Sequence, residues 1–184
     1  MRKIVFLLII FYNQISFGQV VQTYNGAFGD GNAVYQYYEN NLNRFYHGNF
    51  TFTNKYETVK GTFNNNLKIG KWQYSYKNVL KETEILENIT GNFDNGNMNG
   101  EWKHSYKKIV NGKIIESKNS IANFLDNNFI GKFSVNISIP NYILSINGQF
   151  NEFGFLDSVW NFKIKKDGIL RTYTSIRRKV KKSS

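Results

Sequence analysis

The sequence has no cysteine, and this absence excludes disulfide bonds and thiolate metal ligands. Packing alone must therefore hold the folded chain together. Histidine is scarce as well: His47 and His104 lie far apart in the chain, and neither has a cluster of acidic residues beside it. Because a metal site needs three or four suitable ligands, we predict no metal site and no cofactor. His104 is expected to be a packed, hydrogen-bonded histidine.

The usual signatures of catalysis are also missing. Glu82, Glu84 and Glu87 are close in sequence, but on a strand Glu82 and Glu84 share one face and Glu87 takes the other. Alternation with lysines on a solvated strand explains them more simply than acid and base catalysis. Ser105 points to the strand face opposite His104, so the two do not pair as nucleophile and base. No glycine-rich loop precedes a helix to hold phosphate, and we predict no catalytic residue.

The chain has no apolar run that would span a bilayer, although its N-terminus is apolar. The basic residues Arg2 and Lys3 precede an apolar run at 4–12, about half the length that spans a membrane. Small residues follow at Ser16 and Gly18. This order is typical of a secretory signal peptide, which we predict for residues 1–18; the alternatives are an uncleaved anchor and a buried strand. Cleavage would leave a soluble, periplasmic or secreted protein of one domain.

Acidic residues are few, and the charge imbalance lies at one end of the chain. The formal net charge is +11, with 24 Lys and Arg against 13 Asp and Glu. Residues 163–184 hold nine basic groups and one acidic group, whereas residues 19–162 hold 13 basic and 12 acidic groups. The body of the protein is therefore nearly neutral, and the basic C-terminal end, residues 171–184, stands apart from it.

The basic C-terminal end has two interpretations. It predicts binding to an acidic lipid or glycan, with strong salt dependence. The contacts would come from Arg177, Arg178, Lys179, Lys181 and Lys182. Alternatively, these charges protect the last edge of a sheet from pairing with other chains. Nucleic acid is not an expected partner, because no motif that reads it accompanies the charges.

In place of these signatures, the sequence contains a repeat of glycine and aromatic residues. "GTFNNNLKIGKW" at 61–72 aligns without a gap with "GNFDNGNMNGEW" at 91–102. Further copies lie at 122–133, at 148–160 and, more faintly, at 26–37. The copy at 122–133 has Ala122 for the first glycine and Phe133 for the tryptophan. The spacing recurs far more often than this composition gives by chance, so the copies are an internal repeat.

The segments between the copies have the pattern of half-buried strands. Residues from Trp72 to Lys77 are alternately aromatic and polar, and the other copies are followed by the same alternation. Turn-like segments separate the outgoing and returning limbs, and no stretch of comparable length has a helical period. We therefore predict an all-β domain over residues 19–170, an antiparallel meander of stacked hairpins.

The recurring glycines have a physical explanation. Glycine in a strand leaves a shallow site on the sheet face, and an aromatic ring from a neighbouring strand can lie over it. We expect glycine and ring to form one packing unit. Asn66, Gly96 and Asn127 take equivalent positions in the turns, and these residue types tolerate positive φ best. A left-handed turn residue is therefore expected in each copy.

The spacing from Gly91 to Trp102 resembles the MORN repeat, a short glycine and aromatic hairpin that stacks into an elongated single-layer sheet. The resemblance covers about residues 26–160, in four or five copies. The residues that define it are Gly61, Phe63, Gly70, Trp72, Gly91, Phe93, Gly96, Gly100, Trp102, Phe124, Gly131, Phe133, Gly148, Phe150 and Trp160. It implies stacked MORN-like hairpins in a single-layer sheet, open or curled. It also implies a scaffold or binding module without catalysis of its own, in some members associated with membranes or acidic lipids.

Residues 30–52 are denser in aromatic side chains than the rest. The rings are Tyr35, Tyr37, Tyr38, Phe45, Tyr46, Phe50 and Phe52, and they fall on both strand faces. We interpret the segment as a first hairpin that is buried on one side and caps the sheet. The alternative is an aromatic platform for sugar rings or another flat ligand.

Together these features predict an exported, non-enzymatic scaffold or binding module whose partner is a protein or a component of the cell envelope. The alternative is an envelope-associated module that binds acidic lipid or glycan through the basic C-terminal end. A third reading is a glycan-acting enzyme, which would need carboxylates or histidines gathered in one cleft. Glu82, Glu84 and His104 are the residues that would have to meet.

Overall fold

The computed structural model describes residues 19–176, and all regular structure in this range is β-strand. The strands are β1 (Gln22–Phe28), β2 (Gly31–Asn40), β3 (Asn43–Thr53), β4 (Glu57–Asn64), β5 (Leu67–Leu80), β6 (Thr83–Asp94), β7 (Asn97–Val110), β8 (Lys113–Leu125), β9 (Asn128–Ile139), β10 (Tyr142–Phe150), β11 (Leu156–Lys166) and β12 (Ile169–Ile176). The predicted signal peptide lies outside the described residues. Residues 19–176 contain no helix that is long and apolar enough to cross a membrane.

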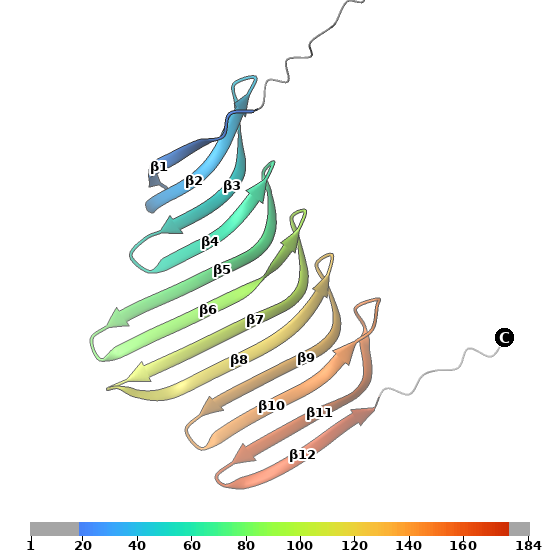
Figure 1. Ribbon diagram of the computed structural model, residues 1–184. Helices are drawn as coiled ribbons and strands as arrows, with labels where there is room; N and C mark the ends of the chain where they lie inside the picture. The colour runs from blue at the N-terminus through green and yellow to red at the C-terminus, as the bar shows by residue number, and fades with distance from the viewer. Residues whose placement is uncertain (1–18, 177–184) are drawn as a thin grey trace, which may run out of the picture.

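The strands lie in the sheet in the same order as in the chain, and each pairs antiparallel with its neighbours. Figure 1 shows a single layer, from β1 at the top to β12 at the bottom, whose strands bend near their upper right ends. β1 and β12 are edge strands, so the sheet is open. The predicted all-β antiparallel meander is confirmed. Residues 171–176, part of the basic C-terminal end, lie in β12 within the same sheet.

In three of the repeat copies the turn uses two residues with positive φ, whereas the loop of the copy at 148–160 has one, Gly154. The pairs are Asn65 and Asn66 between β4 and β5, Asn95 and Gly96 between β6 and β7, and Asp126 and Asn127 between β8 and β9. Such two-residue turns match the twist of paired strands, and asparagine, aspartate and glycine tolerate them best. The left-handed residues predicted at Asn66, Gly96 and Asn127 are confirmed. The positive φ of the residue before each of them was not predicted.

The tips of these turns also bind the preceding hairpin. Backbone N–H groups donate to carbonyl oxygens, from Asn66 to Tyr46 (2.9 Å), from Gly96 to Lys68 (2.9 Å) and from Asn127 to Met98 (3.1 Å). In the two asparagine copies the side-chain Oδ1 also accepts from the backbone N–H of the same partner, at 2.7 Å for both Tyr46 and Met98. Asparagine therefore extends the backbone pairing between successive hairpins, which glycine does not.

Replacing Asn127 with glycine is expected to lower the free energy of unfolding by about 1 kcal/mol, because the Met98 N–H loses its side-chain acceptor. Glycine keeps the φ of 67° without strain. Asn127→Ala is expected to cost roughly 1–2 kcal/mol more, through left-handed strain. Chemical denaturation measures both changes. A glycine variant as stable as the wild-type protein would show that the side chain contributes nothing.

In three copies a tryptophan ring lies directly against the glycine of the facing strand. The pairs are Gly61 and Trp72 on β4 and β5, Gly91 and Trp102 on β6 and β7, and Gly148 and Trp160 on β10 and β11. A Cβ atom on any of these glycines would overlap the ring. Each indole Nε1–H donates to the carbonyl of the residue after its glycine, at 3.2 Å. The predicted contact is confirmed, and the indole hydrogen bond fixes the orientation of each ring.

The glycines that precede the rings have another role. Gly70, Gly100 and Gly131 have no atom from beyond their chain neighbours within 4 Å of where a Cβ would lie, and their φ values are 61°, 69° and 63°. The expectation that rings cover them is therefore wrong. In the first case, three residues from Gly70 to Trp72 stand opposite Gly61 alone. This is a β-bulge, which bends the strand, and the positive φ requires glycine.

The rings form a continuous ladder along one side of the sheet, which we call the aromatic face. Trp72 and Trp102 both contact Phe93, with ring centroids 6.0 and 5.1 Å away, so they point to the same side. The ladder continues through Phe124, Phe129, Phe133 and Phe150 to Trp160. The Lys68 Nζ lies 4.6 Å from the Trp72 ring centroid. Because its neighbours cover it, Trp72 is only 1% exposed in a sheet of one layer.

Two copies depart from the glycine and tryptophan unit. In the copy at 122–133, Ala122 pairs in register with Phe133, so the added methyl group accompanies a smaller ring. In the faint copy at 26–37, a Cβ on Gly26 would meet the hydroxyl of Tyr24, on its own strand, at 2.9 Å. The turn of its hairpin, between β1 and β2, also lies at the opposite end of the strands from the turns of the other copies (Figure 1). The assignment of this copy to the repeat is wrong.

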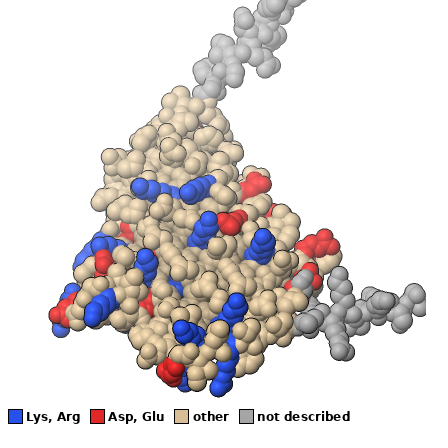
Figure 2. Space-filling model, turned by 60° about the horizontal axis from the view of Figure 1, so that its bottom comes forward, with Lys and Arg blue, Asp and Glu red and all other residues tan. Residues whose placement is uncertain are grey.

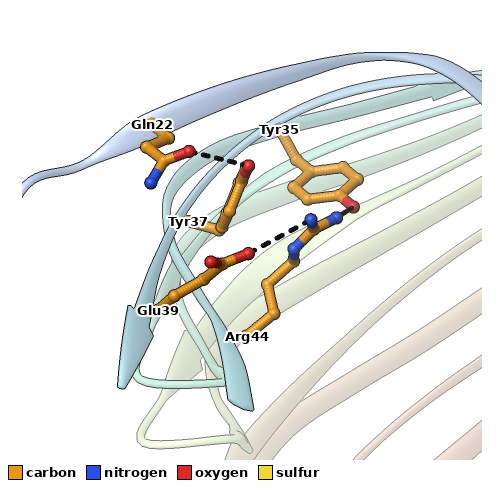
Figure 3. A network of polar contacts seen from close by, with 5 residues as sticks. All are labelled: Gln22, Tyr35, Tyr37, Glu39 and Arg44. Carbon is orange, nitrogen blue, oxygen red and sulfur yellow. Dashed lines mark hydrogen bonds and ion pairs between the residues drawn. The ribbon is translucent and has the colours of Figure 1, made fainter. Parts of the chain in front are cut away.

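The dense aromatic segment covers the N-terminal end of the sheet. Tyr35, Tyr37, Tyr38 and Phe52 are all buried. Figure 3 shows Arg44 beside Tyr35 and Tyr37, where it donates to the Tyr35 hydroxyl at 2.9 Å and to Glu39 at 3.3 Å. The Arg44 guanidinium also lies 4.1 Å from the Tyr37 ring centroid, and the Tyr35 hydrogen bond raises the pKa of Arg44. Because four of the seven rings are buried and the other three half-buried, the segment fits a cap better than an open platform.

Candidate functional site

The residues considered for catalysis do not gather in one cleft. Glu84 lies on the side of the sheet opposite the tryptophans and pairs with Lys77 at 2.7 Å. Glu87 lies on the aromatic face, and Glu82 lies in the turn before β6. Glu84 and His104 are therefore on opposite faces. Hydrolysis of a glycosidic bond uses two carboxylates that flank the same bond, and these residues do not provide that geometry.

His104 forms a pair that the sequence did not indicate. Its Nε2 lies 2.7 Å from the Glu87 carboxylate, on the aromatic face. Ser120 stands opposite His104 in register, but no hydrogen bond joins the two among the described residues. Ser105 lies on the other face, as expected. The expected hydrogen-bonded histidine is confirmed, and within residues 19–176 no three His, Cys, Asp or Glu side chains are placed to hold a metal ion.

The side of the sheet opposite the tryptophans, which we call the polar face, is a larger candidate site than the pair of His104 and Glu87. Its central row takes one residue from each strand from β4 to β10. The row is Thr58, Ser75, Asn88, Ser105, Asn119, Asn136 and Ser145, each in register with the next. Every member has a hydroxyl or an amide group. Neighbouring strands lie about 4.8 Å apart, so the row presents one hydrogen-bonding side chain at each such step.

A groove of about 560 Å³ crosses the polar face from β7 to β11. Its side chains come from Glu101, Ile121, Asn123, Lys132, Ser134, Asn147, Gln149, Val159 and Asn161. A second row in register, from Ile121 through Ser134 and Asn147 to Asn161, runs through it. The Asn123 Nδ2 donates to the Lys132 carbonyl at 2.9 Å, which fixes this amide at the groove wall. Most residues that line the groove therefore have side chains that can hydrogen-bond.

The polar face is basic around this groove. Between β7 and β11 it carries Lys103, Lys107, Lys132, Lys163 and Lys165 against Glu101 and Asp157. Glu101 is paired with Lys103 at 2.9 Å. Figure 2 shows basic side chains spread over the side of the molecule in view, with fewer acidic ones among them. The face therefore attracts anions, although the body of the chain is nearly neutral.

A second exposed surface lies at the C-terminal end of the sheet. In the loop between β10 and β11, Phe153 and Phe155 are 72% and 59% exposed, and Leu156 beside them is also exposed. Val159 pairs in register with Ile176, so β12 ends next to this loop. The five basic residues predicted to bind an anionic surface, Arg177, Arg178, Lys179, Lys181 and Lys182, follow directly but lie outside the described residues.

The polar groove was not found from the sequence. Its signal was present in the polar residues that alternate with the rings, such as Ser134 after Phe133 and Asn161 after Trp160. Those residues were used only to assign strands. The groove depends on which of them meet across strands, and the bulges that set this register could not be placed from one sequence. Comparison with models of protein families, with curated proteins and with solved structures finds no match.

Proposed function

We propose that the protein is a non-enzymatic binding module that presents its polar face to a large partner. The observation that carries this proposal is the in-register row of hydroxyl and amide groups across seven strands, β4 to β10. The aromatic ladder on the other face keeps these strands in place. A sheet with one ordered polar surface is suited to an extended ligand, because contacts repeat from strand to strand.

Export and a MORN-type architecture remain part of the proposal. The predicted leader favours a partner in the cell envelope or outside the cell. The stacked hairpins, each tied to the one before through its turn, support a scaffold role. The positions of Glu84 on the polar face and His104 on the aromatic face make the glycan-acting enzyme the weakest of the three readings.

Sedimentation with insoluble bacterial envelope material tests the binding function. We expect saturable retention of the protein without time-dependent release of soluble sugar. Asn119→Glu, in the middle of the polar row, is expected to weaken retention by about fivefold or more. The exposed turn variant Lys81→Glu is the matched control and should bind as the wild-type protein does. Equal binding by both variants would argue against the polar face, and steady release of product would favour an enzyme.

A second candidate function is docking to an acidic membrane surface. The observation that favours it is the exposed loop of Phe153 and Phe155 beside the end of β12, where the basic segment begins. An apolar contact and a basic segment together hold a protein at an anionic bilayer more firmly than either alone. This would use the C-terminal end of the sheet and leave the polar face free.

Vesicle binding separates this candidate from the first. Removing residues 171–184 would delete most of β12, so the five basic residues after Ile176 should instead be changed to glutamine. We expect the wild-type protein to bind phosphatidylglycerol vesicles but not phosphatidylcholine vesicles, and less as salt rises. The glutamine variant and Phe153→Ser should each bind less. Retention that neither change reduces would reject the membrane function.

A further inference from the structure

The groove on the polar face combines two surfaces that a sugar requires. Asn147, Gln149 and Asn161 present amides, each of which donates and accepts hydrogen bonds. A sugar hydroxyl also donates and accepts, so an amide can either donate a hydrogen bond to it or accept one from it. Ile121 and Val159, which are 36% and 41% exposed, add a small apolar surface. That surface suits the C–H face of a pyranose ring, because ligand sites combine apolar walls with a few polar groups that fix orientation.

The strand register sets the direction in which a ligand would lie. Ile121, Ser134, Asn147 and Asn161 stand side by side on four neighbouring strands, β8 to β11. The strand spacing of about 4.8 Å is close to the rise of one sugar in an extended β-linked chain. A glycan that crosses the strands therefore meets a side chain in the equivalent strand position at each sugar. A single small molecule would use only one step of this row.

Charge decides between a neutral and an acidic glycan. Lys132 lines the groove, and Lys163 lies two residues beyond Asn161 on the same face of β11. The Glu101 carboxylate, the one acidic group that lines the groove among the described residues, is already paired with Lys103. Because basic groups outnumber acidic ones on the polar face around the groove, with Asp157 as the other acidic group there, a ligand that carries carboxylates complements it best.

We propose that the groove binds an acidic, extended, β-linked polysaccharide across strands β7 to β11, one sugar to a strand. The inference rests on the proposed binding function and gives its ligand a chemical class. It places the contact on the polar face, where Val159 and Asn161 pair with Ile176 and Thr174 of β12, and not on the basic residues that follow Ile176. The basic residues after Ile176 would add attraction for the same ligand, whereas the groove would set the orientation of the chain.

The test compares two glycans that share a linkage and differ in charge. β-1,4-linked mannuronate oligomers and neutral β-1,4-linked mannose oligomers of matched length are titrated into the full-length protein by calorimetry. We expect the mannuronate to bind and the neutral oligomer to bind at least about tenfold more weakly. Longer oligomers should bind more tightly until they span the five strands.

Two pairs of variants locate the contact. Lys132→Glu is expected to weaken mannuronate binding by about tenfold or more. Lys71→Glu is its matched control, since Lys71 takes the same place before the ring in another copy, outside the groove. Asn147→Asp, almost isosteric, is the second variant, with Asn111→Asp as its control, since Asn111 lies in the turn between β7 and β8, outside the groove and the polar row. Thermal unfolding should be nearly unchanged for all four, because these side chains are exposed.

Each other outcome has a defined meaning. Equal losses of mannuronate affinity in Lys132→Glu and Lys71→Glu would show that the charge of the whole polar face attracts the ligand. This result would overturn the assignment of the binding site to the groove. Loss of binding only when the basic residues after Ile176 become glutamine would move the site to the C-terminal end. Equal affinity for both oligomers would overturn the acidic class. If neither oligomer binds, this inference fails, and sedimentation with envelope material still decides the binding function separately.

Discussion

Trp72→Ala is expected to lower the free energy of unfolding by about 3–5 kcal/mol, the range found for large aromatic residues in a packed core. The ring is 1% exposed and lies between Phe50 and Phe93, with ring centroids 6.0 Å from each, while Phe63 packs edge-on at 5.0 Å. Its Nε1–H also donates to the Thr62 carbonyl. The loss is a large part of the stability of a typical domain, and urea denaturation measures it.

Trp160→Ala is the matched control for this prediction. Trp160 has the same glycine partner and the same indole hydrogen bond, but it lies next to an apolar cavity of about 770 Å³ at the C-terminal end of the sheet. Because Trp160 is packed by fewer neighbouring side chains on the side of this cavity, Trp160→Ala should lower the free energy of unfolding by less than Trp72→Ala does. Equal costs at the two positions would show that the ladder adds nothing beyond each hairpin.

Gly91→Ala is expected to cost about 3 kcal/mol or more, although it adds only a methyl group. The new Cβ would overlap the Trp102 ring, so the ring must leave its place and its hydrogen bond to the Asn92 carbonyl. The copy at 122–133 shows which change would relieve the clash, because there an alanine meets a phenylalanine ring. Chemical denaturation of Gly91→Ala against the wild-type protein gives the cost.

A double-mutant cycle tests that explanation. Gly91→Ala should cost at least about 1 kcal/mol less in a Trp102→Phe background than in the wild-type protein. Gly70→Ala is the control, since its φ of 61° disfavours alanine by strain alone, without any clash. The cost of Gly70→Ala should be the same in the wild-type and Trp102→Phe backgrounds. Additive costs for Gly91→Ala and Trp102→Phe would instead show that the ring and the glycine are not coupled.

The fold could be predicted well from the sequence because its rules are local. Alternation from Trp72 to Lys77 identified a half-buried strand, and Asn66, Gly96 and Asn127 marked the turns. The repeat then supplied the order of the hairpins, since equivalent copies must pack in equivalent ways. The same argument failed for the copy at 26–37. Its short sequence similarity to the repeat did not correspond to a hairpin of the same orientation or to a glycine covered by a ring from the facing strand.

The candidate site could not be predicted in the same way, because it depends on cross-strand register. Glycines that look alike in sequence have two roles: Gly61 makes room for a ring, and Gly70 lets the backbone bulge. The register that follows from such bulges determines that Asn147 stands beside Ser134 and Asn161. The pairing of His104 with Glu87 is likewise diagonal across two strands, and no spacing in the sequence indicates it.

The agreement between strand order and chain order has a consequence for how the protein folds. Each strand pairs only with the strands just before and after it, so every stretch of backbone needs partners that are near it in the chain. Closing such short loops costs little entropy, and folding should be rapid for an all-β protein. The sheet can also grow one hairpin at a time from its capped first end, which allows a chain that emerges gradually to acquire structure as it appears.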